Sequence, residues 1–318
     1  MPFIRKSLAA VSAALAVFAS SAIAQGYPER PVQLLVPFPA GAPVDALARA
    51  FGIALDRQLN QRVVVMNRDG ASTTIAMNTL LAAPADGYTV VYGPVTALTV
   101  HVHWMKGLQF KADSFTPLCQ TFENVFFLAA GPNSTIKDWN AVAAAAKGKP
   151  GGVTYAQPGV ASSPHLAGAE LFQRAGVAAT DVPFRGESAI VPQLREGVVD
   201  LAVVTTGLVE TQGLRPIVAF ADQRLPGFPN TPTAAELGIQ VHPSGYGGLF
   251  VRSDTPAPVM AKLEQACKGA VADRDFQEVA RRFHQQTDYL DRARFTARLQ
   301  ADSRTKAELL KTVKLERQ

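Results

Sequence analysis

The feature that most constrains this chain is a repeated pattern of a short apolar run, a small turn-rich loop and the start of a segment with helical periodicity. The clearest case joins the apolar run 32–36 to the segment 43–59, whose apolar residues recur three and four positions apart. Pro43 suits the first helical position, and Asp45 puts a negative charge in the first turn. Such alternation predicts an α/β fold with mostly parallel sheets flanked by helices.

The loops of this pattern lie where α/β proteins bind ligands, beyond the carboxyl ends of parallel strands. Backbone N–H groups at helix starts attract anions, and a carboxylate suits N–H and hydroxyl donors. We therefore predict that the loops face one another across a cleft that holds a small carboxylate. The four loops are Ala40–Asp45, Gly70–Thr74, Gly159–His165 and Phe184–Ser188.

The candidate ligand-binding residues come from these loops, from Phe38 just before the first loop, and from one strand end. They are Phe38, Ala40, Gly41, Ala42, Asp45, Ser72, Thr73, Thr74, Ser162, Ser163, His165, Arg185, Gly186 and Thr205. A structural role is an open alternative for most of them. The hydroxyl residues can cap their own helices, Asp45 can serve only the helix dipole, and His165 can pack or cap. Arg185 can be a solvated surface charge. In the third loop, Ser163 is the expected N-cap, with Pro164 as the first helical residue.

The N-terminus has the pattern of a secretory signal peptide. Arg5 and Lys6 precede an apolar run from Leu8 to Ile23, and Ala22-Ile23-Ala24 matches a cleavage site. We predict removal of residues 1–24. A membrane anchor is the alternative, but the run is short, and no other segment reaches membrane-spanning length. The net charge of +5 is scattered, without the basic run of a nucleic-acid-binding arm.

Two apolar stretches are expected to connect separate halves of the protein. Leu118–Ala130 is too long for an average strand, and Gly247–Val251 reads as a second crossing strand. These crossings predict one lobe from 25–123 and 244–318 and a second from 124–243, with hinges near 122–125 and 243–248. The charged helix expected at Arg292–Lys314 covers the first lobe.

The sequence carries no recognisable catalytic or metal-binding signature. A nucleophile elbow, a phosphate-binding loop and a dinucleotide-binding glycine pattern are all absent from the sequence. His101 and His103 alternate as in a strand, but no third metal ligand follows at useful spacing. Cys119 and Cys267 could pair in an oxidising compartment or remain two buried thiols, and both alternatives stay open.

Eight motifs in order resemble one protein family over the whole chain after residue 24. They are Tyr27–Pro31, Pro37–Asp45, Asn67–Ala71, Ala83–Thr89, Gly159–Ala167, Val182–Gly186, Val199–Asp200 and Pro229–Thr233. Together they resemble the Bug receptors, the periplasmic solute-binding proteins of tripartite tricarboxylate transporters. The resemblance implies a two-lobed, type II-like periplasmic binding protein fold. We expect the protein to be a monomer that needs no cofactor. Such a receptor closes over a small carboxylate or related amide, using backbone amides of the first two loops, and delivers it to a two-component membrane permease. It is not an enzyme.

The chain departs from the family pattern in the loops that should hold the ligand. Gly41-Ala42 stands where two glycines are usual, and Asp69-Gly70-Ala71-Ser72-Thr73 replaces Pro-Gly-Ala-Gly-Gly. The segment after Thr205 is shorter than usual, which predicts a trimmed helix. These changes leave the ligand open, including a neutral or partly cationic one. Two rival functions use the same cleft: a ligand-loaded sensor for a membrane signalling partner, and a periplasmic enzyme.

Overall fold

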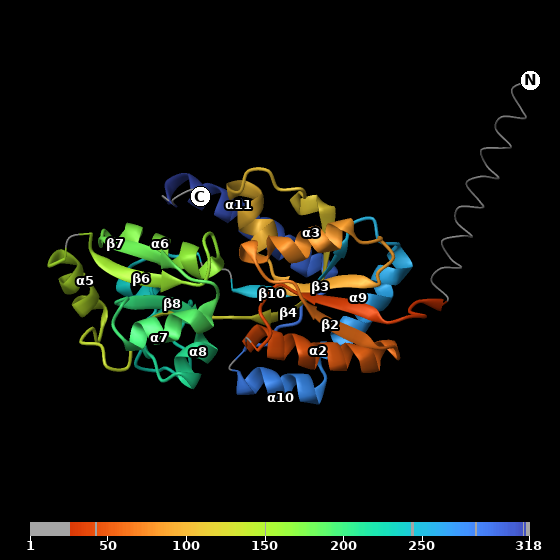
Figure 1. Ribbon diagram of the computed structural model, residues 1–318, viewed down its shortest axis with the longest axis horizontal. Coiled ribbons are helices and arrows are strands. Elements are labelled where there is room, and N and C mark those ends of the chain that lie inside the picture. Colours follow the sequence, from red (N-terminus) through yellow and green to blue (C-terminus); the bar gives the residue numbers. More distant parts are fainter. Residues whose placement is uncertain are drawn as a thin grey trace, which may run out of the picture.

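A computed structural model describes residues 26–41, 43–149, 151–242, 245–283, 285–313 and 315. Two five-stranded sheets lie side by side, with strand orders β2-β1-β3-β10-β4 and β7-β6-β8-β5-β9 (Figure 1). We call the parts built on these sheets the first and second lobes. The strands are β1 (Val32–Val36), β2 (Val63–Asn67), β3 (Thr89–Pro94), β4 (Phe115–Glu123), β5 (Phe126–Ala130), β6 (Val153–Gln157), β7 (Ala179–Pro183), β8 (Leu201–Thr205), β9 (Arg215–Phe220) and β10 (Tyr246–Arg252).

Helices cover both faces of each sheet. They are α2 (Pro43–Leu59), α3 (Thr74–Ala82), α4 (Val102–Trp104), α5 (Trp139–Lys147), α6 (Ser163–Ala175), α7 (Ile190–Arg195), α8 (Thr206–Thr211), α9 (Ala257–Val271), α10 (Arg274–Arg282) and α11 (Arg292–Thr312). Short helical turns precede three of them: η1 (Ala71–Thr73), η2 (Ala97–His101) and η4 (Glu187–Ala189). No described helix is both long and apolar enough to cross a membrane. The predicted signal peptide lies outside the described residues.

Each lobe has an apolar core on both faces of its sheet. In the first lobe, α2, α9 and α10 supply Phe51, Leu263 and Phe276 to one core, while α11 supplies Phe295 to the other. The second lobe packs α5 and α6 on one face and α7 and α8 on the other. Burial on both faces explains why β5 is a continuous apolar run and why β8 is apolar up to its last residue. The two-lobed α/β fold is therefore confirmed.

The predicted crossing strand at Leu118–Ala130 is two strands in different sheets. β4 ends at Glu123 in the first lobe, and β5 begins at Phe126 in the second. Between them, Asn124 N donates a hydrogen bond to Gly245 O at 2.6 Å, so the two crossing segments lie side by side. Both sheets are mixed rather than mostly parallel, because β10 and β5 run antiparallel to their two neighbours.

One further expectation needs correction. His101 and His103 lie in the helical turn η2 and in α4, so the strand suggested by their alternation is absent at those positions. A short helix, α8, follows β8 directly, which agrees with the trimmed helix expected after Thr205. The elements β1 and α2 match their predicted bounds, and α11 begins at the predicted Arg292 and ends two residues before the predicted Lys314.

The two cysteines form a disulfide that ties β4 to α9. Cys119 and Cys267 are fully buried, and their Cα atoms are 6.6 Å apart. This bond decides the alternative that the sequence left open. It closes a loop of the chain that includes the whole second lobe, since the two cysteines are 148 positions apart.

Removing this disulfide should destabilise the protein. Because the bond restricts the unfolded chain, reduction is expected to lower the free energy of unfolding by about 2–4 kcal/mol. Urea unfolding with and without a thiol reductant measures the difference. The double variant Cys119→Ala/Cys267→Ala is the control, and reductant should leave its midpoint unchanged. An equal midpoint for the oxidised and reduced wild type would contradict the stabilising role.

Candidate functional site

Three hydrogen bonds join the loops of the two lobes at their facing edges. Ser72 Oγ donates to Val160 O at 2.9 Å, and Thr96 Oγ1 and Ser163 Oγ are 3.0 Å apart. His101 Nε2 lies 3.2 Å from Ala161 O. The structure therefore brings the second and third predicted loops into direct contact, on the side of the lobes formed by α3, η2 and α6.

Asp45 organises the first loop from within. Its carboxylate, 2% exposed, accepts hydrogen bonds from Gly41 N at 2.9 Å, Asn67 Nδ2 at 2.7 Å and Arg49 Nε at 3.0 Å. Asn67 also donates to Phe38 O at 2.9 Å. Burial raises the pKa of Asp45, but the hydrogen bonds from these partners outweigh it and hold the pKa below its usual value. The carboxylate thus fixes the loop from Phe38 to Gly41.

The rest of the first loop is more open. Ala40 and Gly41 are exposed, Phe38 is partly buried, and Ala42 lies outside the described residues. Gly41 has a φ of 86°, so its left-handed conformation favours glycine there. Because its N–H donates to Asp45, this amide already has a partner in the structure.

The second loop contains three consecutive non-glycine residues in the left-handed region. The φ angles are 42° at Ala71, 49° at Ser72 and 84° at Thr73. For a β-branched residue such as Thr73 this conformation is strained, at about 1–3 kcal/mol. The Thr73 hydroxyl is also buried without a hydrogen-bond partner among the described residues. The backbone has kept a shape suited to glycine although Ser72 and Thr73 replace the usual glycines.

Thr74 ends this turn and begins α3. Its N–H and its Oγ1 both bond to Ala71 O, the latter at 2.8 Å, and Thr73 N donates to Gly70 O at 3.1 Å. Thr74 is 4% exposed. The side chain therefore stabilises its own turn, the structural alternative raised for it.

Replacing the strained Thr73 should stabilise the protein. Thr73→Gly removes the left-handed strain and the unpaired hydroxyl, and we expect a gain of about 1 kcal/mol after the entropy cost of glycine. Thermal and urea unfolding measure it. Thr74→Gly is the matched control: φ at Thr74 is −67°, so glycine relieves nothing there and should destabilise. Destabilisation by Thr73→Gly would contradict the strain.

His165 holds the third loop rather than projecting a free nitrogen. Its Nδ1 accepts from Ala161 N at 3.0 Å, and its Nε2 lies 3.3 Å from Asp181 Oδ2. Since Nδ1 is an acceptor, the network assigns the proton to Nε2. The hydrogen bond from His165 is the main reason that the pKa of Asp181 is lowered.

The N-cap of α6 is Ser162, not Ser163 as predicted. Ser162 Oγ accepts from His165 N at 3.3 Å, and the helix begins at Ser163 with Pro164 next. Ser163 is turned toward Thr96 of the first lobe, and its side chain is buried. Ser162 therefore caps the helix, while Ser163, the first helical residue, makes the contact between the lobes.

The fourth loop exposes Arg185 and carries an acid that sequence reasoning passed over. Gly186 has a φ of 82°, and its N–H donates to Pro158 O at 3.1 Å. Glu187 Oε1 accepts from Thr205 N at 2.9 Å, and Oε2 accepts from Thr205 Oγ1 at 2.7 Å. Thr205, a predicted site residue, is therefore already bonded to Glu187. In the sequence, the only signal for Glu187 as a candidate site residue is its position inside the fourth loop.

Burial raises the pKa of Glu187 from 4.5 to about 7, although the two hydrogen bonds from Thr205 lower it. Between these values the folded protein binds the proton more tightly than the unfolded chain. The contribution of Glu187 to the free energy of unfolding is therefore lost as the pH rises from 4.5 to about 7.

Glu187→Gln should remove this pH dependence. The melting temperature of the wild type relative to the variant should fall by several degrees between about pH 4 and pH 8. Thermal unfolding of both proteins across that range measures the difference, and contributions from other groups cancel. A difference that does not change with pH would contradict the burial of an ionisable group.

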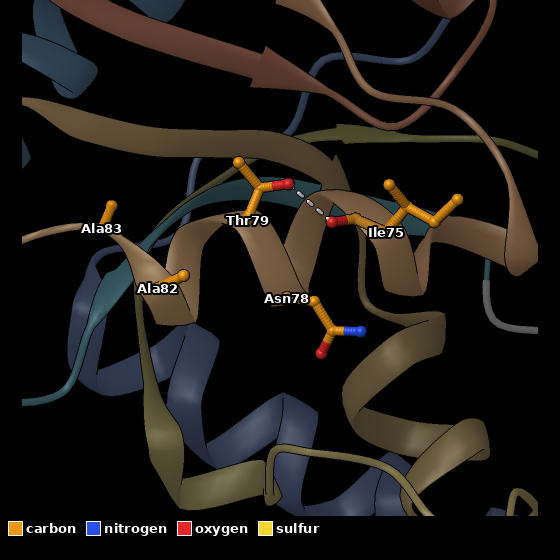
Figure 2. A pocket seen from close by; sticks show the side chains of 5 residues that line it. All are labelled: Ile75, Asn78, Thr79, Ala82 and Ala83. Carbon is orange, nitrogen blue, oxygen red and sulfur yellow. Dashed lines mark hydrogen bonds between the residues drawn. The ribbon is translucent and has the colours of Figure 1, made fainter.

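Two hollows of the surface lie away from the predicted ligand-binding residues. One of about 590 Å³ lies on the outside of α3, where Ile75, Asn78, Thr79, Ala82 and Ala83 line it (Figure 2). The other, of about 260 Å³, runs between α8 and the residues that follow α10. Neither hollow includes a predicted ligand-binding residue. The described residues hold no group of three or more acidic, histidine or cysteine side chains suited to a metal ion.

The two sheets, the paired crossing segments and the loops at facing edges define a periplasmic binding protein fold. The structure of the periplasmic binding protein BugD has the same fold, with a TM-score of 0.82 and 26% identity, covering 92% of this chain and all of that one. MatC from Rhodopseudomonas palustris with bound malate gives a TM-score of 0.80 at 26% identity, covering 89% of this chain and all of MatC.

Sequence comparison identifies the family. The model of the tripartite tricarboxylate transporter family receptor matches residues 47–315. BugT of Bordetella pertussis is 34% identical over 232 residues, 71% of each chain. A UPF0065 protein of Cupriavidus necator is 30% identical over 299 residues, 90% of this chain and 89% of that one. The chain belongs to the tripartite tricarboxylate transporter receptor family. It is a periplasmic-type solute-binding receptor and not an enzyme, and the predicted Bug resemblance is confirmed.

Proposed function

We propose that this receptor binds a small carboxylate between its lobes and delivers it to a two-component membrane permease. The observation that carries the proposal is the meeting of loops from both lobes at the carboxyl ends of their parallel strands. Family membership supports it, since MatC, a solved structure with the same fold, holds malate.

Arg185 is the charged group best placed to pair with a ligand carboxylate. It is exposed in the fourth loop, and among the described residues its guanidinium makes no hydrogen bond or ion pair. Ser72 lies close to the same edge, at the contact between the lobes, where its hydroxyl donates to Val160 O. A guanidinium offers paired donors to a carboxylate, which makes the interaction strong and directional.

The proposal includes the movement and the location of the receptor. The lobes, 25–123 with 244–318 and 124–243, would close about hinges near 122–125 and 243–248, of which 243 and 244 lie outside the described residues. The change of sheet between Glu123 and Phe126 supports this division. Residues 1–24 would direct export to the periplasm and be removed, and the receptor would act as a monomer.

A thermal-shift screen of residues 25–318 tests the proposal, after unfolding and refolding to remove carried ligand. The panel contains mono- and dicarboxylates, aromatic acids, amino acids and amides. A carboxylate at 100 times its dissociation constant should add about 2.7 kcal/mol to stability. Arg185→Ala should lower the affinity for that carboxylate by about tenfold or more. Arg304→Ala, which removes an exposed arginine on α11, is the control and should bind normally. Shifts from no carboxylate, or an unchanged affinity in Arg185→Ala, would count against this site.

A further inference from the structure

Glu187 occupies the edge of the second lobe where a ligand would lie. It follows β7, yet its carboxylate reaches Thr205 at the end of β8. In the sheet, β6 lies between β7 and β8, so Glu187 crosses the carboxyl end of β6. The loop after β6 contains Val160, which accepts the hydrogen bond from Ser72 of the first lobe. The acid thus stands on the same edge as a contact between the lobes.

The surroundings of Glu187 differ from those of the structural acids in this protein. Asp45 is paired with Arg49, Glu170 with Arg174 and Asp200 with Lys149. Among the described residues, Glu187 forms no ion pair. Its hydrogen-bond donors are the N–H and the hydroxyl of Thr205, which carry no positive charge. A partly buried carboxylate without a cation is unfavourable in its ionised form, and a cation from outside would stabilise that form.

A second acid favours the same charge on the ligand. Asp69 is exposed at the start of the second loop and, among the described residues, makes no hydrogen bond or ion pair. With Glu187 it places negative charge on one loop of each lobe, while Arg185 offers a positive charge two residues before Glu187. Groups of both signs on these loops match a ligand that carries both signs.

We propose that Glu187 is a specificity-determining residue that selects carboxylates bearing an ammonium group over dicarboxylates of the same length. This inference rests on the proposed function. The ligand ammonium donates to the Glu187 carboxylate while the ligand carboxylate pairs with donors such as Arg185. A dicarboxylate would instead place a like charge beside Glu187, and that repulsion rejects it.

Isothermal titration at about pH 8, where Glu187 is ionised, tests the inference with pairs of matched length. The pairs are β-alanine and succinate, 4-aminobutyrate and glutarate, and 5-aminovalerate and adipate. For the pair that fits, the wild type should bind the amino acid at least about tenfold more tightly than the dicarboxylate.

Glu187→Gln should shift that preference by about tenfold or more toward the dicarboxylate. The variant keeps the fold, because its amide oxygen can accept from Thr205 N and its NH₂ can donate to Thr205 Oγ1. Glu196→Gln is the matched control, since Glu196 is exposed at the end of α7 and should leave the preference unchanged. Melting curves confirm that each variant is folded.

The possible outcomes separate this inference from the proposed function. A wild type that binds carboxylates but prefers the dicarboxylate overturns the role of Glu187, as does an unchanged preference in Glu187→Gln. A wild type that binds no carboxylate in these pairs or in the wider screen overturns the proposed function, and the inference with it.

Discussion

The pairing of the two crossing segments is the constraint on which the arrangement of the lobes depends. β10 pairs with β4 along its length, and Asn124 N donates to Gly245 O where both segments leave the first sheet. Glu123 N also donates to Gln286 O, which brings the segment after α10 to the same point. Because the lobes are joined here, the loops that follow β2 and β6 can meet, as the hydrogen bond from Ser72 to Val160 O shows.

Elements whose signals are local could be predicted well from the sequence. β1 and α2 match their predicted bounds because an apolar run, a proline-rich loop and an amphipathic segment follow in order. The stretch Leu118–Ala130 forms two strands in different sheets rather than one crossing strand, and the polar pair Glu123-Asn124 inside it is the local signal for the hinge expected near 122–125. The helical conformation at His101 could not be predicted, because it depends on packing against α6 and α11, which lie far away in the sequence.

The predicted second and third loops do meet, but the partners of the candidate side chains could not be predicted. Asp45 and His165 were chosen for their positions at helix starts, and both direct their polar atoms into their own lobe. Their partners, Asn67 and Asp181, lie 22 and 16 positions away, beyond the reach of a local pattern. Glu187 was missed for the same reason, since only its contact with Thr205 distinguishes it from an ordinary acid in a helix turn.

The contacts between the lobes divide the site into two parts with different roles. On the side of α3 and α6, Ser72 and His101 bond directly to the second lobe, and burial lowers the pKa of His101 to about 4, which keeps it neutral. Val100 and Leu309 of the first lobe add apolar contact with Leu166 there. Such contacts can hold the lobes together, but they involve few charged groups to distinguish one ligand from another. Charges occur instead on the fourth loop, where Arg185 and Glu187 offer both signs. A ligand shifts closure only by its differential affinity for the closed state, and the fourth loop is where that difference can depend on ligand charge.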